Sequence, residues 1–348
     1  MQPMLRMAPT CYHALHQFPA VAAHEMNFFY DEGLRSASGE RRYEILDHGL
    51  CPFGQEHLGM WQAQVENNVQ VLLDVKPQSV FYARQHAKAD LYIVAGWRNQ
   101  QTTVWAARPD VTSLADLRGR TVGIIDFSGI SHNALKTRIR SAGLDPDQDV
   151  RWLRGVSRPH NIDYLRSGKV DATLFQAHQI PALEAEGFNI LVSPSRDEFP
   201  GGRAERVVAV SGELINERPD DLVAFLRGLL RSYWFMRNQP ANFRYLAAME
   251  KRKRIDHPSP SEKRRVTFTS PEVGAGMPFP IDGLATGYHW ALKDAVDNGE
   301  LDEIPSDVEV DSVSQLQFVE AAYTELKERP EVQEDLAAAR AAFDRLGF

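Results

Sequence analysis

The feature that most constrains this 348-residue chain is a regular alternation of short apolar runs with helical stretches between residues 4 and 211. The runs have the length of β-strands, and strands that alternate with helices form a largely parallel sheet covered on both faces. The runs are MLRMA (4–8), YEILDHGL (43–50), VQVLLDV (69–75), LYIVAGW (91–97), TTVWAAR (102–108), TVGIID (121–126), VRWL (150–153), DATLF (171–175), NILVS (189–193) and RVVAVS (206–211).

Residues typical of helix ends lie between these runs and support the predicted helices. Ser113 opens SLADLRG, with Asp116 three residues on and Gly119 just past the end, which predicts a capped helix. Glycines end helices where a left-handed residue is needed, and prolines begin them where the missing N–H costs nothing. Residues placed in this way are Pro159, Pro181, Gly143 and Gly187.

The character of the chain changes after about residue 212. NERPDDLVAFLRGLLRSYWFMRNQ (216–239) places apolar residues on one helical stripe. Further helices are expected near 241–255, 284–299, 312–328 and 331–346. The predicted fold is therefore α/β, closed by a helical C-terminal third. The stripe consists of Leu222, Phe225, Leu226, Leu229 and Leu230.

Composition narrows the class of protein. The length suggests two domains, and a hydrophobic content of 43% with 25% charged residues is that of a globular protein. A net charge of −8 argues against a nucleic-acid partner, and no run reaches the ~18 apolar residues of a membrane span. The N-terminus lacks a secretory signal, so a cytoplasmic location is expected if the sequence is the complete gene product, and a periplasmic one if a leader was removed.

Two loops that follow apolar runs are candidate ligand sites. In open parallel sheets, ligands bind outside the carboxyl ends of the strands, near helix N-termini. PTCYHALHQFPA (9–20) follows the first run, and Phe127-Ser128-Gly129-Ile130-Ser131 follows the run at 121–126. The second loop suits a carboxylate, sulfonate or phosphate, although serine is also the commonest helix N-cap.

Several segments, taken in order, resemble one known family. The segment 9–34 contains Pro-Thr-x-Tyr-His and ends in Phe-Tyr-Asp-Glu-Gly-Leu. SLADLRGRTVGI (113–124) then precedes the Ser/Gly loop, and LRSGKVDATLF (165–175) follows it. This order resembles alkanesulfonate-binding and thiamine-pyrimidine-synthase-like proteins, which have the type II periplasmic-binding-protein fold. The resemblance covers residues 4–211 and, more weakly, 298–311.

The resemblance implies two lobes, each a mostly parallel sheet flanked by helices. Lobe one would be 1–100 with 212–348, and lobe two 101–211, joined by crossings near Gln101 and Val210. A ligand would lie in the cleft between them. The cleft loops implied are 10–17, 48–57, 74–81, 126–132, 176–179 and 199–204.

The resemblance also places individual residues in the cleft. In the pyrimidine-synthase branch a histidine lies in the first loop and a lysine follows the third strand, and His13 and Lys76 fall near those places. That branch carries a cysteine-rich segment, whereas FPGGRAERVVAV (199–210) has no cysteine. The ligand-binding residues expected are Thr10, Tyr12, His13, His16, Lys76, Ser79, Ser128, Gly129, Ser131, His132 and Gln176.

Cys11 admits three interpretations. With His13 and His16 it forms C-x-H-x-x-H, but nothing nearby completes a four-ligand zinc site unless the loop 48–57 contributes, so no metal and no cofactor is expected. As a thiolate at a helix N-terminus it would be a nucleophile, as in an aromatic sulfinate desulfinase built on the same fold. As a small buried residue it would have no chemical role.

The resemblance thus implies a solute-binding protein with an ABC permease as a possible partner, and the residues of the first loop suit a small anionic ligand, aromatic or heteroaromatic. The alternative is a cytoplasmic enzyme on the same fold, a lyase or hydrolase such as a decarboxylase or desulfinase of an aromatic acid. In that case Cys11, His13 and Lys76 would be the catalytic residues.

Overall fold

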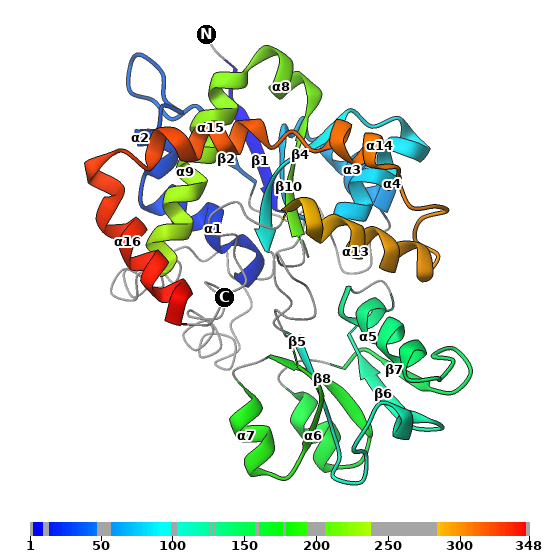
Figure 1. Cartoon of the computed structure of the whole chain (residues 1–348). Coiled ribbons are helices and arrows are strands. Elements are labelled where there is room, and N and C mark those ends of the chain that lie inside the picture. The colour runs from blue at the N-terminus through cyan, green and yellow to red at the C-terminus, as the bar shows by residue number, and fades with distance from the viewer. Residues whose placement is uncertain are drawn as a thin grey trace.

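The computed structural model describes residues 3–9, 14–46, 57–98, 103–125, 127, 130–156, 160–176, 179–193, 206–237 and 284–345. Within these ranges the strands form two separate five-stranded sheets, one in each of two lobes (Figure 1). The two-lobed α/β fold predicted from the sequence is confirmed.

The sheet of lobe one has the strand order β2-β1-β3-β10-β4. Strand β1 pairs in parallel with β2 and β3, whereas β10 is antiparallel to both of its neighbours, β3 and β4. Four of the five strands therefore point the same way. The strands are β1 (Leu5–Pro9), β2 (Tyr43–Ile45), β3 (Val71–Val75), β4 (Leu91–Arg98) and β10 (Arg206–Ser211).

The sheet of lobe two repeats this plan in the order β7-β6-β8-β5-β9. Strand β6 pairs in parallel with β7 and β8, and β5 runs antiparallel to β8 and β9. Again four strands share a direction, as expected of a mostly parallel sheet. The strands are β5 (Thr103–Ala107), β6 (Thr121–Ile124), β7 (Arg151–Arg154), β8 (Ala172–Gln176) and β9 (Asn189–Val192).

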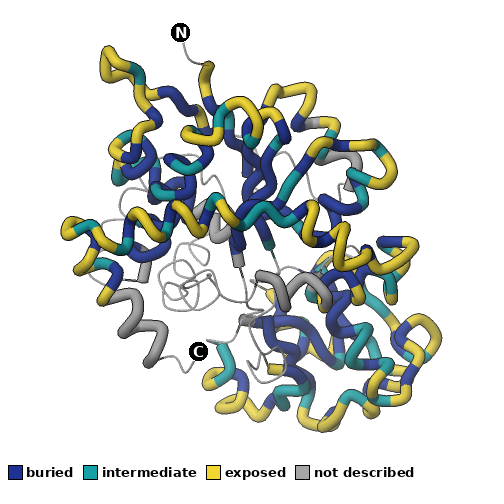
Figure 2. The backbone as a smooth tube through the Cα atoms, turned by 45° about the horizontal axis from the view of Figure 1, so that its top comes forward, coloured by how far each residue is buried: buried dark blue, intermediate teal, exposed yellow. Residues whose placement is uncertain are grey.

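Helices cover both faces of the sheet of lobe one. Helices α1, α2, α9, α15 and α16 pack on one face and α3, α4, α13 and α14 on the other (Figure 1). Figure 2 shows buried backbone in the middle of each lobe and exposed backbone at the periphery. The helices of lobe one are α1 (Ala14–Glu25), α2 (Phe28–Asp31), α3 (His57–Glu66), α4 (Pro77–Ala87), α8 (Gly212–Glu217), α9 (Pro219–Arg237), α13 (Leu284–Asp297), α14 (Asp307–Val313), α15 (Gln317–Leu326) and α16 (Pro330–Arg345). Those of lobe two are α5 (Ile130–Ser141), α6 (Asn161–Arg166) and α7 (Ile180–Ala185).

Helix α9 is the central packing element of lobe one. All five residues of the predicted stripe are buried, which confirms that this face of the helix faces the core. Phe225 stacks on Phe29 with 5.4 Å between the ring centroids. Gly228 allows this close approach, because a Cβ there would lie 2.6 Å from the Phe29 ring. The predicted helix 216–239 is divided into α8 and α9, since Pro219 has no N–H with which to continue a helix.

The return to lobe one occurs earlier than the sequence analysis placed it. Residues 206–211 were expected in lobe two with a crossing near Val210, but they form β10 of the first sheet. Val210 is fully buried and lies opposite Val71 and Tyr92 in the sheet. A residue paired on both sides cannot serve as a hinge, so the second crossing falls between Val192 and Arg206. Gln101, at the first crossing, lies outside the described residues.

The helix predicted from Ser113 is only a short 3-10 turn, Ala115–Leu117. The cap is supplied by Asp116, whose carboxylate accepts hydrogen bonds from the backbone N–H groups of Thr112 (3.0 Å) and Ser113 (2.9 Å). Gly119 has the left-handed conformation expected at the end, with φ +71°. The signature was correct in position, but the five residues between Ser113 and Gly119 allow little more than one helical turn, and that turn is 3-10.

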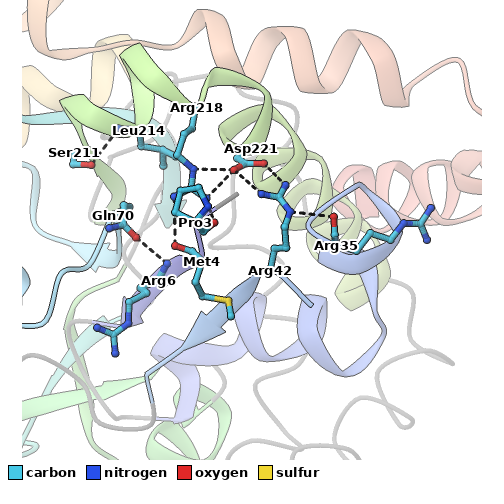
Figure 3. A network of polar contacts seen from close by, with 10 residues as sticks. All are labelled: Pro3, Met4, Arg6, Arg35, Arg42, Gln70, Ser211, Leu214, Arg218 and Asp221. Atoms are coloured by element: carbon cyan, nitrogen blue, oxygen red, sulfur yellow. Dashed lines mark hydrogen bonds and ion pairs between the residues drawn. The ribbon is translucent and has the colours of Figure 1, made fainter. Parts of the chain in front are cut away.

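At the amino ends of the strands of lobe one, a charged network fixes the start of the chain (Figure 3). Asp221 of α9 accepts hydrogen bonds from Arg42 (2.6 Å) and Arg218 (2.7 Å). Arg218 also donates to the carbonyl oxygen of Pro3 at 2.8 Å. Burial raises the pKa of Asp221, but the two guanidinium groups outweigh it and hold the pKa below its ordinary value. This network lies at the edge opposite to the candidate site.

A second buried carboxylate ties the N-terminal part of lobe one to its C-terminal helices. Glu32, which follows α2, is 5% exposed. Its carboxylate accepts hydrogen bonds from Arg227 (2.8 Å) and Arg231 (2.8 Å) of α9, and from Arg329 (2.9 Å) before α16. The exposed Glu325 also accepts a hydrogen bond from Arg227, at 2.6 Å. Glu32 is thus the buried anion around which three cations are arranged.

In lobe two, His132 holds the loop between β6 and α5. Its Nδ1 lies 2.9 Å from the carbonyl oxygen of Phe127, and its ring packs edge-on against Trp152 with 4.5 Å between the centroids. Burial lowers the pKa of His132, and the hydrogen bond to Phe127 opposes this only in part. The imidazole is therefore neutral at physiological pH, with its proton on Nδ1 where it donates to Phe127.

We expect Glu32→Gln to destabilise the protein by about 3 kcal/mol, because removing one partner of a buried ion cluster leaves the remaining charges uncompensated. Urea denaturation at neutral pH measures the change. Glu325→Gln is the matched control, since it removes the same charge from an exposed position and should cost less than about 1 kcal/mol. Equal effects of the two substitutions would contradict the central role of Glu32.

We also expect the free energy of unfolding to decrease as the pH is lowered, because His132 titrates. Its pKa in the folded protein is lower than the 6.5 of a free histidine, so below about pH 6.5 the unfolded chain binds the proton preferentially. The loss continues until the pH reaches the folded-state pKa. His132→Gln keeps an N–H for Phe127 but does not titrate, so its unfolding free energy should vary less between about pH 7.5 and about pH 5.5. Parallel curves for the two proteins, from urea denaturation, would exclude His132 as the cause.

Candidate functional site

The carboxyl-end edges of the two sheets face each other. The chain leaves lobe one at the end of β4 and enters lobe two at the start of β5, which lies beside the end of β8 because the two strands are antiparallel. It leaves again at the end of β9 and returns at the start of β10, beside the end of β3. Both crossings therefore join these two edges, and Figure 1 shows the strand ends directed toward the middle of the molecule. This is where ligands bind in open α/β sheets.

On lobe one, three charged residues gather at this edge. Asp74 near the end of β3 is fully buried and has φ +64°, a strained conformation for a residue with a side chain. Arg206 at the start of β10 places Nε 4.0 Å from Asp74 Oδ1, too far for a hydrogen bond. This buried Nε has no hydrogen-bond partner within the described part of the chain. Lys76, half-buried, follows directly after β3.

Lys76 and Ser79 are brought together by the start of α4. Lys76 is the N-cap residue in an extended conformation, and Pro77 opens the helix. The Ser79 N–H donates to the Lys76 carbonyl oxygen at 3.0 Å, and Ser79 is 5% exposed. Both residues were predicted for the site, and both lie at the carboxyl-end edge. Whether they touch a ligand stays a prediction.

On lobe two, Ser131 lies at the facing edge. Its hydroxyl donates to Thr103 Oγ1 at 3.2 Å, which ties the first turn of α5 to the first residue of β5. The Phe127 ring, in the loop before α5, is 49% exposed. His132, also predicted to bind ligand, packs instead between Phe127 and Trp152. The geometry gives His132 a role in holding the loop, and a direct ligand contact stays a prediction.

The remaining predicted residues are not tested by the geometry. His16 lies in α1 and Gln176 ends β8 opposite Thr103, and only their backbone is described. The others lie outside the described residues, and their roles stay predictions. These are Thr10, Cys11, Tyr12, His13, Ser128 and Gly129.

At this edge, Asp74 lay within the predicted cleft loop 74–81 but was not among the expected ligand-binding residues, and Arg206 lay outside every predicted cleft loop. A signal existed for both, because a carboxylate interrupts the apolar run VQVLLDV and a guanidinium opens RVVAVS. A charge within a buried strand is uncommon and requires a partner or a function. The 130 residues between Val75 and Arg206 hid the fact that the two runs are neighbours in the sheet.

Among the described residues, no group of three or more His, Cys, Asp or Glu side chains is arranged to hold a metal ion. No helix in the described ranges is long and apolar enough to cross a membrane.

Solved structures with the same architecture include several solute-binding proteins. The periplasmic sulfonate-binding protein SsuA of Methylobacillus flagellatus is 15% identical, with a TM-score of 0.64 over 95% of this chain and 96% of that chain. The periplasmic nitrate-binding protein NrtA of Synechocystis is 12% identical, with a TM-score of 0.63 over 98% and 97%. The desulfurization enzyme DSZB is 14% identical, with a TM-score of 0.59 over 93% and 99%. At these identities the similarity establishes the fold alone.

Sequence comparison gives a more specific result. The chain is 32% identical over 146 residues to the formylaminopyrimidine-binding protein of Halalkalibacterium halodurans, a match that spans 39% of this chain and only 41% of that protein. The model of the family described as NMT1/THI5 like matches residues 58–243, which is more than half of the chain. The predicted resemblance is therefore confirmed, and the chain belongs to the NMT1/THI5-like family.

Proposed function

We propose that the protein is the substrate-binding component of an ABC-type importer and holds a small anionic heteroaromatic ligand between its lobes. The observation that carries this proposal is the pair of cationic side chains, Lys76 and Arg206, at the carboxyl-end edge of lobe one. Among the described residues, the buried carboxylate nearest to Arg206 is that of Asp74, at 4.0 Å. A buried guanidinium N–H with no described partner is a ready donor for an anionic group of a ligand.

The opposite edge offers complementary groups. The N-terminus of α5 directs backbone N–H groups and the positive end of the helix dipole toward the same region. The Ser131 hydroxyl, which here donates to Thr103, is proposed to donate to the ligand instead when the ligand is bound. The exposed ring of Phe127 provides a flat apolar surface against which a heteroaromatic ring can stack. Tyr12 and His13 are proposed to contribute from the segment between β1 and α1, and His16 from α1.

The partner and the location follow from the relatives. The similar proteins are named as binding sulfonate, nitrate and formylaminopyrimidine, and two of the three are named as periplasmic. By analogy we assign this chain to the extracytoplasmic side of a membrane, where it would deliver its ligand to an ABC permease. The anionic character of the ligand is proposed from Lys76 and Arg206, and its heteroaromatic character from the exposed ring of Phe127.

We expect Lys76→Met and Arg206→Met each to weaken ligand binding by at least about tenfold, because a hydrogen bond to a charged group is lost. Isothermal titration calorimetry with formylaminopyrimidine, an alkanesulfonate, nitrate and an aromatic carboxylate identifies which compound binds and measures the change. Lys293→Met removes a similar charge from an exposed surface of α13 and serves as the control, with an expected change of less than about twofold. Unaltered affinity in both edge variants would remove these cations from the site.

The alternative is an enzyme acting on an aromatic acid, and its support is the fold shared with DSZB together with Cys11 in the loop after β1. In that case a thiolate attacks the substrate, and an alcohol cannot replace it near neutral pH. The two functions make opposite predictions for the same substitution.

For a receptor, we expect biphenyl-2-sulfinic acid and aromatic carboxylates to be recovered unchanged after incubation with the protein, as measured by mass spectrometry. Cys11→Ser should retain the affinity of the wild type, because the loop then contributes only shape and hydrogen bonds. Product formation that is abolished by Cys11→Ser, His13→Ala or Lys76→Ala would establish the enzyme and refute the receptor.

A further inference from the structure

The segment α13 and the turn after it belong to lobe one but reach lobe two. Leu292, Ala295 and Leu301 are buried in the same core cluster as Val75 and Val80 of lobe one. Helix α13 lies against α5, as Figure 1 also shows. Within the described residues, this segment therefore joins the lobes at a place other than the two chain crossings.

Glu300 is the centre of this junction. Its Oε1 accepts a hydrogen bond from the Asn133 side-chain amide of α5 at 2.8 Å, and its Oε2 accepts one from the Gln78 amide of α4 at 3.1 Å. Gln78 is 3% and Asn133 4% exposed. One carboxylate thus accepts a hydrogen bond from a buried amide NH₂ group of each lobe, and both donors would be costly to leave without an acceptor.

Two more contacts extend the junction along α5. Thr137 Oγ1 donates to Asp294 Oδ1 at 3.1 Å, and Arg140 donates to Asn298 Oδ1 at 3.3 Å. These contacts lie one and two turns beyond Asn133 on the same helix. The junction therefore fixes the direction of α5 as well as the position of its first turn.

The position of Glu300 is set by the end of α13. Gly299 has φ +72°, the Glu300 N–H donates to the Ala295 carbonyl oxygen at 2.7 Å, and the Gly299 N–H donates to Val296 at 3.0 Å. This is the Schellman arrangement, with glycine as the left-handed residue after the helix. It turns the chain sharply, so that Glu300 is held between α4 and α5.

The two amides that Glu300 binds lie next to the candidate ligand contacts. Gln78 is two residues after Lys76 and next to Ser79, and Asn133 is two residues after Ser131. We propose that Glu300 is a positioning residue, whose carboxylate holds the first turns of α4 and α5 at a fixed separation across the two lobes. The consequence for ligand binding rests on the proposed function, whereas the junction between the lobes does not.

A carboxylate is well suited to this role. It presents two charged acceptors, one for each amide donor, and hydrogen bonds to a charged acceptor are stronger than neutral ones. Glutamine retains one acceptor oxygen, and its NH₂ group meets the second amide favourably only if that amide turns its oxygen inward. Alanine removes both contacts. The junction should therefore be weakened slightly in Glu300→Gln and more strongly in Glu300→Ala.

The test uses the ligand-free protein, so that it does not depend on the proposed function. Small-angle scattering measures the radius of gyration, and amide hydrogen exchange measures the opening of α4 and α5. For Glu300→Ala we expect a larger radius of gyration and about tenfold faster exchange at the start of α5, with the core strands unchanged. Glu300→Gln should lie between Glu300→Ala and the wild type.

Asp302→Ala is the matched control, because it removes the same charge from the same turn. The Asp302 side chain is 89% exposed, and its ion pair is with His86 within lobe one at 3.9 Å. Asn133→Ala releases the junction from the lobe-two side and decides the question if Glu300→Ala does not fold. Scattering and exchange like those of the wild type in Glu300→Ala or Asn133→Ala, or an equal change in Asp302→Ala, would overturn the proposal.

Discussion

Strand β10 is hydrogen-bonded to β3 on one side and to β4 on the other, and the two-lobed arrangement depends on this pairing. The chain departs for lobe two at the end of β4 and returns as the immediate neighbour of that strand. Because β10 is antiparallel to both neighbours, its first residue, Arg206, stands at the edge where β3 and β4 end. The pairing thus closes the sheet and brings a cation to the ligand side of lobe one.

Buried charge serves two different purposes in this lobe. Around Glu32, three arginines converge on one carboxylate at hydrogen-bond distance, which joins helices from distant parts of the chain. At the facing edge, Arg206 and Asp74 are close but not in direct hydrogen-bond contact. The first arrangement is saturated and stabilises the fold. The second leaves a donor available and strains the backbone at Asp74, which is more typical of a functional site.

The sequence predicted the elements of the fold well, because each of its short apolar runs became a strand and the stripe from Leu222 to Leu230 became the buried face of α9. Periodicity and end signals are local, so they can be read without knowing the partners. The boundary of lobe two at residue 206 could not be read, since it depends on the pairing of β10 with strands more than 100 residues earlier. The junction at Glu300 was equally hidden, because NGELDE is only a helix end until α5 is placed beside it.

The late arrival of β10 also has a consequence for synthesis on the ribosome. Strands β3 and β4 are made early, but the strand that must lie between them follows only after the whole of residues 103–192 has been translated. Lobe two has its own hydrophobic core, separate from those of lobe one, so it can fold as a unit while the first sheet still has a gap. During that interval β3 and β4 present open hydrogen-bonding edges, the kind of surface on which chains aggregate and chaperones act. Synthesis therefore starts with lobe one, but the sheet of lobe one is completed only after lobe two has been made.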